Sequence, residues 1–370
     1  MAEGGFQPPP YPYERLDALK EKAATHEGGA VDLSVGTPCD PPPAFVREAL
    51  ASSDAERGYP PSVGTPALRH AAAAWIERRF GVSVDVAQVA ACVGTKEFVA
   101  TLPQWLKLRL PERDTILYPA VSYPTYEMGA ILAGCRPVGV PLDGEWRLDL
   151  DSIDESDAAR ALALWVNSPG NPAGAIDDLG AAAAWGRRNG VPVFSDECYA
   201  EFTWTGEPAT ILSYGEEGVV AVHSLSKRSN FAGGRAGFYA GDAELLHYLS
   251  EVRKHAGLLM PGPVQAAAVA ALGDDIHVEA QRVRYIQRLD AVRRILSGVG
   301  VEAPMPAGGF YLWAAAPEGD AWSLTARLAA DGGVLLAPGD IFGAQGGTHV
   351  RAAVVQPLAR IELVARRLGL

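Results

Sequence analysis

The spacing of hydrophobic and polar positions becomes regular from about residue 43 onward. Short apolar runs alternate with longer stretches in which apolar residues recur every three or four positions. Short apolar runs are typical of buried strands, and the three-to-four spacing is typical of amphipathic helices. Strands are expected at 89–93, 115–118, 136–140, 161–166, 192–195, 219–223 and 237–240. Helices are expected at 44–52, 66–80, 96–110, 126–133, 179–189 and 243–256.

Strands separated by helical stretches predict an α/β fold in which a mostly parallel sheet has helices on both faces. A long helical region at 263–296 then leads to a C-terminal part of different texture. There, short strands at 309–314, 333–336 and 349–354 are mixed with helices at 322–330 and 357–368. We predict a large domain over 46–265 and a smaller α+β domain, with its linking helix, over 266–370. The Pro-rich residues 1–45, helical only near 13–25, are predicted to form an arm that packs on the small domain or on a partner.

Composition narrows the possible functions. Of the 370 residues, 48% are hydrophobic and 21% are charged, which is typical of a soluble globular protein. The net charge of −12 disfavours nucleic-acid binding, and no apolar run approaches the ~20 residues of a membrane helix. The N-terminus lacks the features of a signal peptide, so a cytoplasmic enzyme is expected. The histidines show no metal-ligand spacing and the cysteines form no close pair, so no metal site is predicted. The four cysteines are Cys39, Cys92, Cys135 and Cys198.

Polar residues gather where the predicted strands end, which is where open α/β sheets bind ligands. Gly94-Thr95-Lys96 follows the strand at 89–93 and precedes a helix, whose free N–H groups suit a phosphate. Each such residue alone has an ordinary structural explanation, as a helix cap, a turn or a surface side chain. Their succession at neighbouring strand ends nevertheless predicts a single ligand site. The other residues of the series are Tyr123, Asn171, Asp196, Tyr199, Ser224, Lys227 and Arg235.

Together these motifs resemble the fold-type I aminotransferases of class I/II, which depend on pyridoxal 5'-phosphate. The resemblance extends from Gly36 to Arg351. It is carried by Asn171-Pro-Ala-Gly174, Asp196-Glu-Cys-Tyr199, Ser224-Leu-Ser-Lys227 and Phe231-Ala-Gly-Gly-Arg235. It implies a seven-stranded, mostly parallel sheet between helices, a smaller α+β domain, and a homodimer with shared active sites.

The resemblance assigns a role to each site residue. Lys227 would bind the cofactor covalently and, once displaced by substrate, carry the proton between the substrate Cα and the cofactor. Asp196 would keep the pyridine nitrogen protonated. Asn171 and Tyr199 would hydrogen-bond the ring oxygen, and Tyr123 would stack on the ring.

The remaining roles concern the phosphate and the substrate. Arg351 would clamp the substrate α-carboxylate, with Gly36 and Asn171 beside it. Gly234, just before the phosphate arginine, departs from relatives that often carry a larger residue. The phosphate would be held by Gly94, Thr95, Lys96, Ser224 and Arg235, and by Tyr59 from the partner subunit.

Within this family, residues 223–233 and 253–261 are most similar to actinobacterial N-succinyldiaminopimelate aminotransferases. This resemblance implies a ping-pong exchange between glutamate/2-oxoglutarate and N-succinyl-2-amino-6-oxopimelate, in lysine and diaminopimelate biosynthesis. Such a substrate needs a second cation, for which the Arg253-Lys254-His255 cluster is the candidate; a helix-dipole role is the alternative.

Other readings of the same sequence remain open. The substrate pair could belong to aspartate, an aromatic amino acid or LL-diaminopimelate, and the reaction could be that of a C–S β-lyase. A non-catalytic regulator built on this fold is disfavoured, because the ~45-residue arm is too short for a DNA-binding domain and the chain is acidic.

Overall fold

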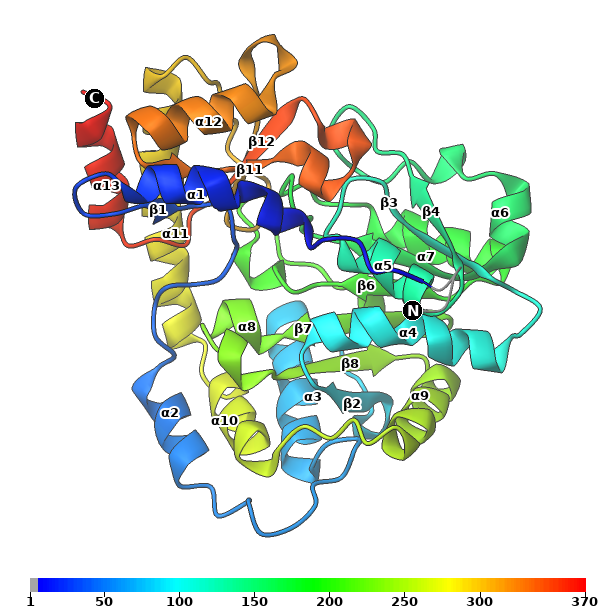
Figure 1. Ribbon diagram of the computed structural model, residues 1–370. Helices are drawn as coiled ribbons and strands as arrows, with labels where there is room; N and C mark the ends of the chain where they lie inside the picture. The colour runs from blue at the N-terminus through cyan, green and yellow to red at the C-terminus, as the bar shows by residue number, and fades with distance from the viewer. Residues whose placement is uncertain (1–5) are drawn as a thin grey trace.

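A seven-stranded sheet forms the centre of the computed structural model, which describes residues 6–370 (Figure 1). Its strand order is β2-β8-β7-β6-β5-β3-β4. Only β8 runs antiparallel to its neighbours, and the other pairings are parallel. The predicted α/β fold with a mostly parallel sheet is therefore confirmed. The strands are β2 (Val89–Cys92), β3 (Thr115–Pro119), β4 (Arg136–Val140), β5 (Ala161–Asn167), β6 (Val193–Asp196), β7 (Val219–Ser224) and β8 (Gly237–Gly241).

Helices cover both faces of this sheet because alternate strand residues point to opposite sides. Val193 of β6 belongs to the core that packs against one set of helices, and the adjacent Phe194 belongs to the core on the other face. The first set is α3 (Pro66–Phe80), α7 (Leu179–Asn189) and α10 (Gly262–Leu272). The second set is α4 (Thr95–Arg109), α5 (Thr125–Leu132) and α9 (Ala243–His255). The shorter helices α2 (Ala44–Ala51), α6 (Glu155–Arg160) and α8 (Leu225–Arg228) complete this part of the chain.

Local sequence accounts for where several of these helices begin and end. Thr65 caps α3 by accepting a hydrogen bond from the Leu68 N–H at 3.3 Å, and Pro66 occupies the first turn. The helix stops at Gly81, whose φ of 68° lies in the left-handed region that glycine adopts without strain. Such caps fix the length of the helices and so fix where the loops at the strand ends begin.

The C-terminal part has its own core, above the large sheet in Figure 1. A three-stranded antiparallel sheet has the order β11 (Ala337–Pro338), β12 (His349–Ala353) and β9 (Tyr311–Ala315). Helices α11 (Ile276–Gly298), α12 (Ala321–Asp331) and α13 (Leu358–Arg367) contribute buried residues to this part of the molecule. The region predicted as one helical stretch at 263–296 is two helices, separated at residues 273–275.

The N-terminal segment lies against these C-terminal elements. Strand β1 (Val31–Asp32) pairs in parallel with β10 (Val334–Leu335), and α1 (Asp17–Ala24) contacts α12 (Figure 1). The first five residues of the predicted arm lie outside the described residues. The domain boundary at residue 265 stays a prediction: α10 packs in the core of the large sheet, whereas α11 packs in the C-terminal core. Among the described helices, none is long and apolar enough to span a membrane.

Candidate active site

A cavity of about 420 Å³ opens at the carboxyl ends of β5, β6 and β7, which finish at Asn167, Asp196 and Ser224. Small-domain strands β9 and β12 contribute Tyr311 and Arg351 to its wall. The structure thus brings together residues that are far apart in the sequence. The predicted site residues that line the cavity are Gly36, Thr95, Lys96, Tyr123, Asn171, Asp196, Tyr199, Ser224, Lys227, Arg235 and Arg351.

Lys227 lies in the short helix α8, which Ser224 caps by accepting a hydrogen bond from the Ser226 N–H at 3.1 Å. The Lys227 ammonium donates a hydrogen bond to the Gly36 carbonyl. Burial lowers the pKa of Lys227 to about 8, and the nearby positive charges of Arg351 and Arg235 act in the same direction. A substantial fraction of this lysine is therefore a neutral, nucleophilic amine near pH 8.

Asp196 is buried, and it accepts two hydrogen bonds at its carboxylate and one at its main-chain carbonyl. The Tyr126 hydroxyl donates to Oδ2 at 2.8 Å, and the Cys198 N–H donates to Oδ1 at 3.2 Å. The Asn167 side chain donates to the Asp196 carbonyl at 2.9 Å. Burial raises the pKa of Asp196, and the hydrogen bonds from Tyr126 and Cys198 to its carboxylate oppose that rise. A carboxylate in such a pocket is suited to pair with a protonated ring nitrogen.

A phosphate-sized cradle lies at the start of α4. Gly94 has φ of 75°, and a Cβ there would lie 2.2 Å from Arg235 Nη2, so only glycine lets the guanidinium approach this closely. The first N–H groups of a helix have no partner within the helix and attract anions. Beside them stand the hydroxyls of Thr95 and Ser224. Gly94 itself shapes the cradle without lining the cavity.

This donor set fits pyridoxal 5'-phosphate. The lysine amine suits an aldehyde, the buried carboxylate suits a pyridinium, and the cradle of N–H groups, hydroxyls and one arginine suits a phosphate. These are three chemically different groups that a single cofactor carries.

Arg351 is buried in β12 and has no carboxylate partner among the described residues. Its Nη1 donates to Asn171 Oδ1 at 2.8 Å, and Nη2 donates to the Ser34 carbonyl. Nε has no hydrogen-bond partner within residues 6–370. The guanidinium lies over the rings of Tyr311 and Phe342, 4.5 and 4.6 Å from their centroids. A buried cation with donors to spare is suited to bind a carboxylate from outside the protein.

The N-terminal arm supplies site residues that sequence reasoning missed. The Tyr11 and Tyr123 hydroxyls lie 2.9 Å apart, and Lys96 Nζ donates to both, at 3.4 and 3.3 Å. Tyr13 also lines the cavity, and Tyr311 shares a 2.8 Å hydrogen bond with Tyr199. The signal available in the sequence was the Tyr11-Pro-Tyr13 pair within a Pro-rich segment, but its place in the fold could not be read from it.

The basic cluster predicted to bind distal carboxylates does not line the cavity. The Arg253 guanidinium is buried against α4, where both Nη atoms donate to the Glu97 carboxylate at 2.8 and 2.7 Å. Lys254 pairs with Glu251 at 2.6 Å on the surface. The expectation is wrong for Arg253 because its charge already has a carboxylate partner within the protein.

Two further positions singled out in the sequence are Gly234 and Tyr59. A Cβ on Gly234 would lie 2.2 Å from the ring of Phe231, which explains why a larger residue is absent before Arg235. Tyr59 is 98% exposed and lies outside the cavity, so its role in a partner's site stays a prediction.

Comparison with known proteins agrees with this geometry. A family model described as aminotransferase class I and II matches residues 29–368, and the chain therefore belongs to this family, whose members use pyridoxal phosphate. The chain is 43% identical to 4-dedimethylamino-4-oxo-anhydrotetracycline transaminase OxyQ of Streptomyces rimosus, covering 97% of this chain and 99% of the relative. It is 34% identical to LL-diaminopimelate aminotransferase of Aquifex aeolicus, covering 97% and 96%.

A solved structure supports the same conclusion. A probable N-succinyldiaminopimelate aminotransferase from Thermus thermophilus superposes with a TM-score of 0.87 and 32% identity, covering 96% of this chain and 99% of that one. The protein is thus a pyridoxal-phosphate-dependent aminotransferase of fold-type I, as the motifs predicted.

Proposed function

We propose that this aminotransferase exchanges amino groups between glutamate/2-oxoglutarate and an oxo acid with carboxylates at both ends, of which N-succinyl-2-amino-6-oxopimelate is the leading candidate. The observation that carries this proposal is a pair of cations on the cavity wall, Arg351 and Lys96. Neither forms an ion pair with a carboxylate of residues 6–370. Two such cations suit a substrate with two separated carboxylates.

The chain's own residues perform the steps around the cofactor. Pyridoxal phosphate, when bound, supplies the electron sink that accepts the electrons of the substrate Cα–H bond. Arg351 orients the substrate by its α-carboxylate, so that the Cα–H bond faces Lys227. Lys227, whose pKa is lowered to about 8, would accept the proton from the substrate Cα and deliver it to the cofactor. Asp196 would pair with the ring nitrogen of the bound cofactor and favour its protonated form.

The far end of the substrate meets the second cation. Lys96 is exposed at the edge of the cavity, and the Tyr11 and Tyr123 hydroxyls fix its ammonium. Two of the compared proteins carry diaminopimelate substrates in their names, which supports a long dicarboxylic acceptor. Lys96 thereby replaces the Arg253 cluster as the proposed site for a distal carboxylate.

A second candidate acceptor has its own support. OxyQ, 43% identical over nearly the full chain, is named for a transamination on an oxo-anhydrotetracycline. Besides Tyr126 and Tyr199, four tyrosines line the cavity here, and aromatic walls suit flat, polycyclic ligands. For such an acceptor the tyrosine rings would matter more than the Lys96 charge. The four are Tyr11, Tyr13, Tyr123 and Tyr311.

We also propose that the active form is a homodimer, to whose partner site Tyr59 contributes. The support is that Tyr59 is 98% exposed, so its ring is free to enter a site on another subunit. Light scattering of the purified protein should give twice the chain mass. A monomer that turns over substrate at full rate would contradict this proposal.

The first test follows the absorbance of the purified protein with glutamate. A band near ~420 nm that moves to ~330 nm would report transfer of the amino group to the cofactor. The aminated protein is then mixed with each acceptor, and the return of the first band gives the rate. No return with N-succinyl-2-amino-6-oxopimelate, together with a fast return with an oxo-anhydrotetracycline, would favour the second candidate.

The Lys96→Met variant separates the two candidates further. Loss of a charged hydrogen bond should raise KM for the dicarboxylic acceptor about 10-fold to 100-fold. KM for pyruvate, which lacks a distal carboxylate, should stay unchanged. Lys254→Met is the matched control, because that lysine pairs only with Glu251 outside the cavity.

A further inference from the structure

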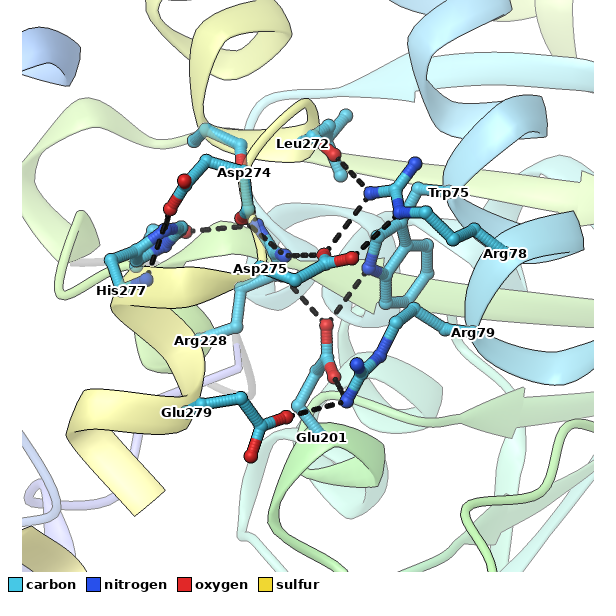
Figure 2. Close-up of polar contacts among 12 residues, drawn as sticks. Trp75, Arg78, Arg79, Glu201, Arg228, Leu272, Asp274, Asp275, His277 and Glu279 are labelled. Carbon is cyan, nitrogen blue, oxygen red and sulfur yellow. Dashed lines mark hydrogen bonds and ion pairs between the residues drawn. The ribbon is translucent and has the colours of Figure 1, made fainter. Parts of the chain in front are cut away.

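A second buried polar cluster lies outside the cavity, at the junction of the large sheet and the helix that leads into the C-terminal part (Figure 2). It brings together α3, the short 3-10 helix η4 (Ala200–Phe202), α8, and the break between α10 and α11. We call it the junction cluster. Its central residues are Trp75, Arg78, Arg79, Glu201, Arg228 and Asp275.

Arg228 is the centre of the junction cluster and is only 2% exposed. An arginine side chain has five N–H groups that can donate hydrogen bonds, and each of the three nitrogens of Arg228 donates to an acceptor. Nε donates to Glu201 Oε1 at 3.1 Å, and Nη1 donates to the Ser229 hydroxyl at 3.1 Å and to the Ala271 carbonyl at 2.7 Å. Nη2 donates to the Asp274 carbonyl and to Asp275 Oδ1, both at 3.4 Å. The side chain therefore joins α8 to η4, to the end of α10 and to the α10–α11 break.

Glu201 is the matching anion. Its Oε1 also accepts a hydrogen bond from Trp75 Nε1 at 2.8 Å, and its Oε2 forms an ion pair with Arg79 at 2.8 Å. From α11, Arg282 donates to the carbonyl of Glu201 itself and to that of Thr203. Both the side chain and the backbone of this segment are thus held.

Arg228 and Glu201 are both close in sequence to residues that line the cavity. Arg228 directly follows Lys227, and Glu201 comes two residues after Tyr199. Their ion pair therefore links the two segments that carry Lys227 and Tyr199 into the cavity. A four-residue helix such as α8 has too few internal hydrogen bonds to fix its own orientation. External contacts must do this, and Arg228 provides them.

We propose that Arg228 and Glu201 are positioning residues, which fix Lys227 relative to Tyr199 and tie both to the start of α11. The proposal rests on the catalytic roles proposed above for Lys227 and Tyr199. A purely structural role is the alternative. Buried ion pairs often stabilise a fold no better than apolar side chains of the same size, so stability alone is a weak reason for this arrangement.

The test compares Arg228→Met and Glu201→Gln with the control Arg78→Met. Arg78 belongs to the same cluster, with bonds to Asp275 and to the Leu272 carbonyl, but within residues 6–370 it forms no hydrogen bond or ion pair with α8 or η4. If Lys227 shifts, the saturated rate of the glutamate half-reaction should fall about 10-fold to 100-fold. KM should change little, because the carboxylate clamp at Arg351 is intact. Arg78→Met should lower the thermal midpoint without this loss of rate.

A second readout needs no cofactor. In the cofactor-free protein, labelling of Lys227 by an amine-directed reagent is followed by mass spectrometry as a function of pH. In Arg228→Met the midpoint should move to higher pH, because a lysine released from its buried place regains water. Arg78→Met should leave the midpoint where it is in the wild type.

Conservative and combined variants complete the test. Arg228→Lys keeps the charge but has fewer donors, so its rate should lie between wild type and Arg228→Met. The double variant Arg228→Met with Glu201→Gln should be no slower than the slower single variant, since both act through one contact. If Arg228→Met does not fold, Arg228→Lys and Glu201→Gln carry the comparison.

The outcomes separate this proposal from the proposed function. Folded, cofactor-bound Arg228→Met and Glu201→Gln proteins with wild-type rates and an unmoved labelling midpoint would overturn it. Equal losses of rate in Arg78→Met would overturn it as well, because the cluster would then be merely structural. A wild-type protein that does not react with glutamate would defeat the proposed function instead, and the labelling midpoint would still report on positioning.

Discussion

Lys227 and Arg228 are neighbours in the chain, yet their side chains belong to two buried polar clusters of different kinds. Around Lys227, the cavity wall carries more cations than carboxylates. Arg351 has no carboxylate partner within residues 6–370, and its Nε has no hydrogen-bond partner there. Around Arg228, in the junction cluster, every guanidinium group meets a carboxylate or carbonyl (Figure 2). The cavity thus holds a buried cation that lacks a carboxylate partner, whereas each arginine of the junction cluster has one, although Arg79 Nε and Glu201 Oε2 have no hydrogen-bond partner within residues 6–370.

This difference suggests how the site works. An unpaired buried cation is unfavourable in the free protein, and a substrate carboxylate removes that cost when it binds. The paired cluster next to it resists displacement, because breaking it would leave a buried charge alone. The junction cluster therefore forms a rigid support directly beside the cavity, where a buried cation still lacks a carboxylate partner.

The largest expected effect comes from Lys227, the cavity residue that directly precedes Arg228. Lys227→Ala removes the group that moves the Cα proton, and the half-reaction with glutamate should slow by about 10⁴-fold, the upper range for acid–base catalysis. Stopped-flow absorbance of the bound cofactor measures this rate. Lys254→Ala, which removes a surface lysine paired with Glu251, is the control and should react at the wild-type rate. A Lys227→Ala protein slowed only a few-fold would place the proton transfer on another residue.

A smaller effect compares the two clusters by stability. Arg228→Met removes one of the two arginine partners of Glu201 and of Asp275, which keep Arg79 and Arg78, and the buried acceptors it leaves without a donor should cost about 1–3 kcal/mol of unfolding free energy. Arg351→Met removes a buried charge without a carboxylate partner, so we expect a change within about 1 kcal/mol of zero. Both values come from urea unfolding of the cofactor-free protein at one fixed concentration, because a dimer's stability depends on concentration.

The stability comparison can also fail in a definite way. If Arg351→Met loses as much unfolding free energy as Arg228→Met, the cavity contains a structural network, and its free hydrogen-bonding capacity has no bearing on ligand binding. A loss for Arg228→Met no larger than that for a surface pair such as Arg15–Asp340 would show that the junction cluster is loosely held.

The sequence predicted much of the cavity cluster and none of the junction cluster, for a physical reason. Asp196 ends a strand, and Asn171 and Lys227 come within four residues of a strand end; the ends of parallel strands meet at one edge of a sheet. Their proximity follows from local spacing together with the fold. Arg228 and Glu201 read as ordinary charged residues, since their pairing depends on how η4, α8 and α10 pack.

The same reason explains the errors at the site. Tyr11 and Lys96 meet only because the N-terminal segment crosses to α4, a contact that no local pattern specifies. Its place in a basic run predicts that Arg253 binds a substrate carboxylate. In the structure it instead forms an ion pair with Glu97, which lies on another helix. The sequence indicates which residues are charged, whereas only the packing shows which charges already have partners.

The smallest expected effect concerns the charges around Lys227. The pKa of Lys227 is lowered to about 8, mainly by burial; the charge of Arg351 contributes to this lowering, and that of Asp196 opposes it. Because the neutral amine reacts, labelling of Lys227 in the cofactor-free protein should increase as the pH rises through about 8. Arg351→Met removes a positive neighbour, so the pKa rises and the midpoint moves to higher pH, by up to about one unit. Asp196→Asn removes a negative neighbour, so the midpoint moves to lower pH. Arg15→Met, at the surface with Asp340, should leave it unchanged. Shifts of the same sign in the two cavity variants would mean that changes of packing outweigh charge there, and the contrast between an electrostatically incomplete cavity and a fully paired junction would lose its basis.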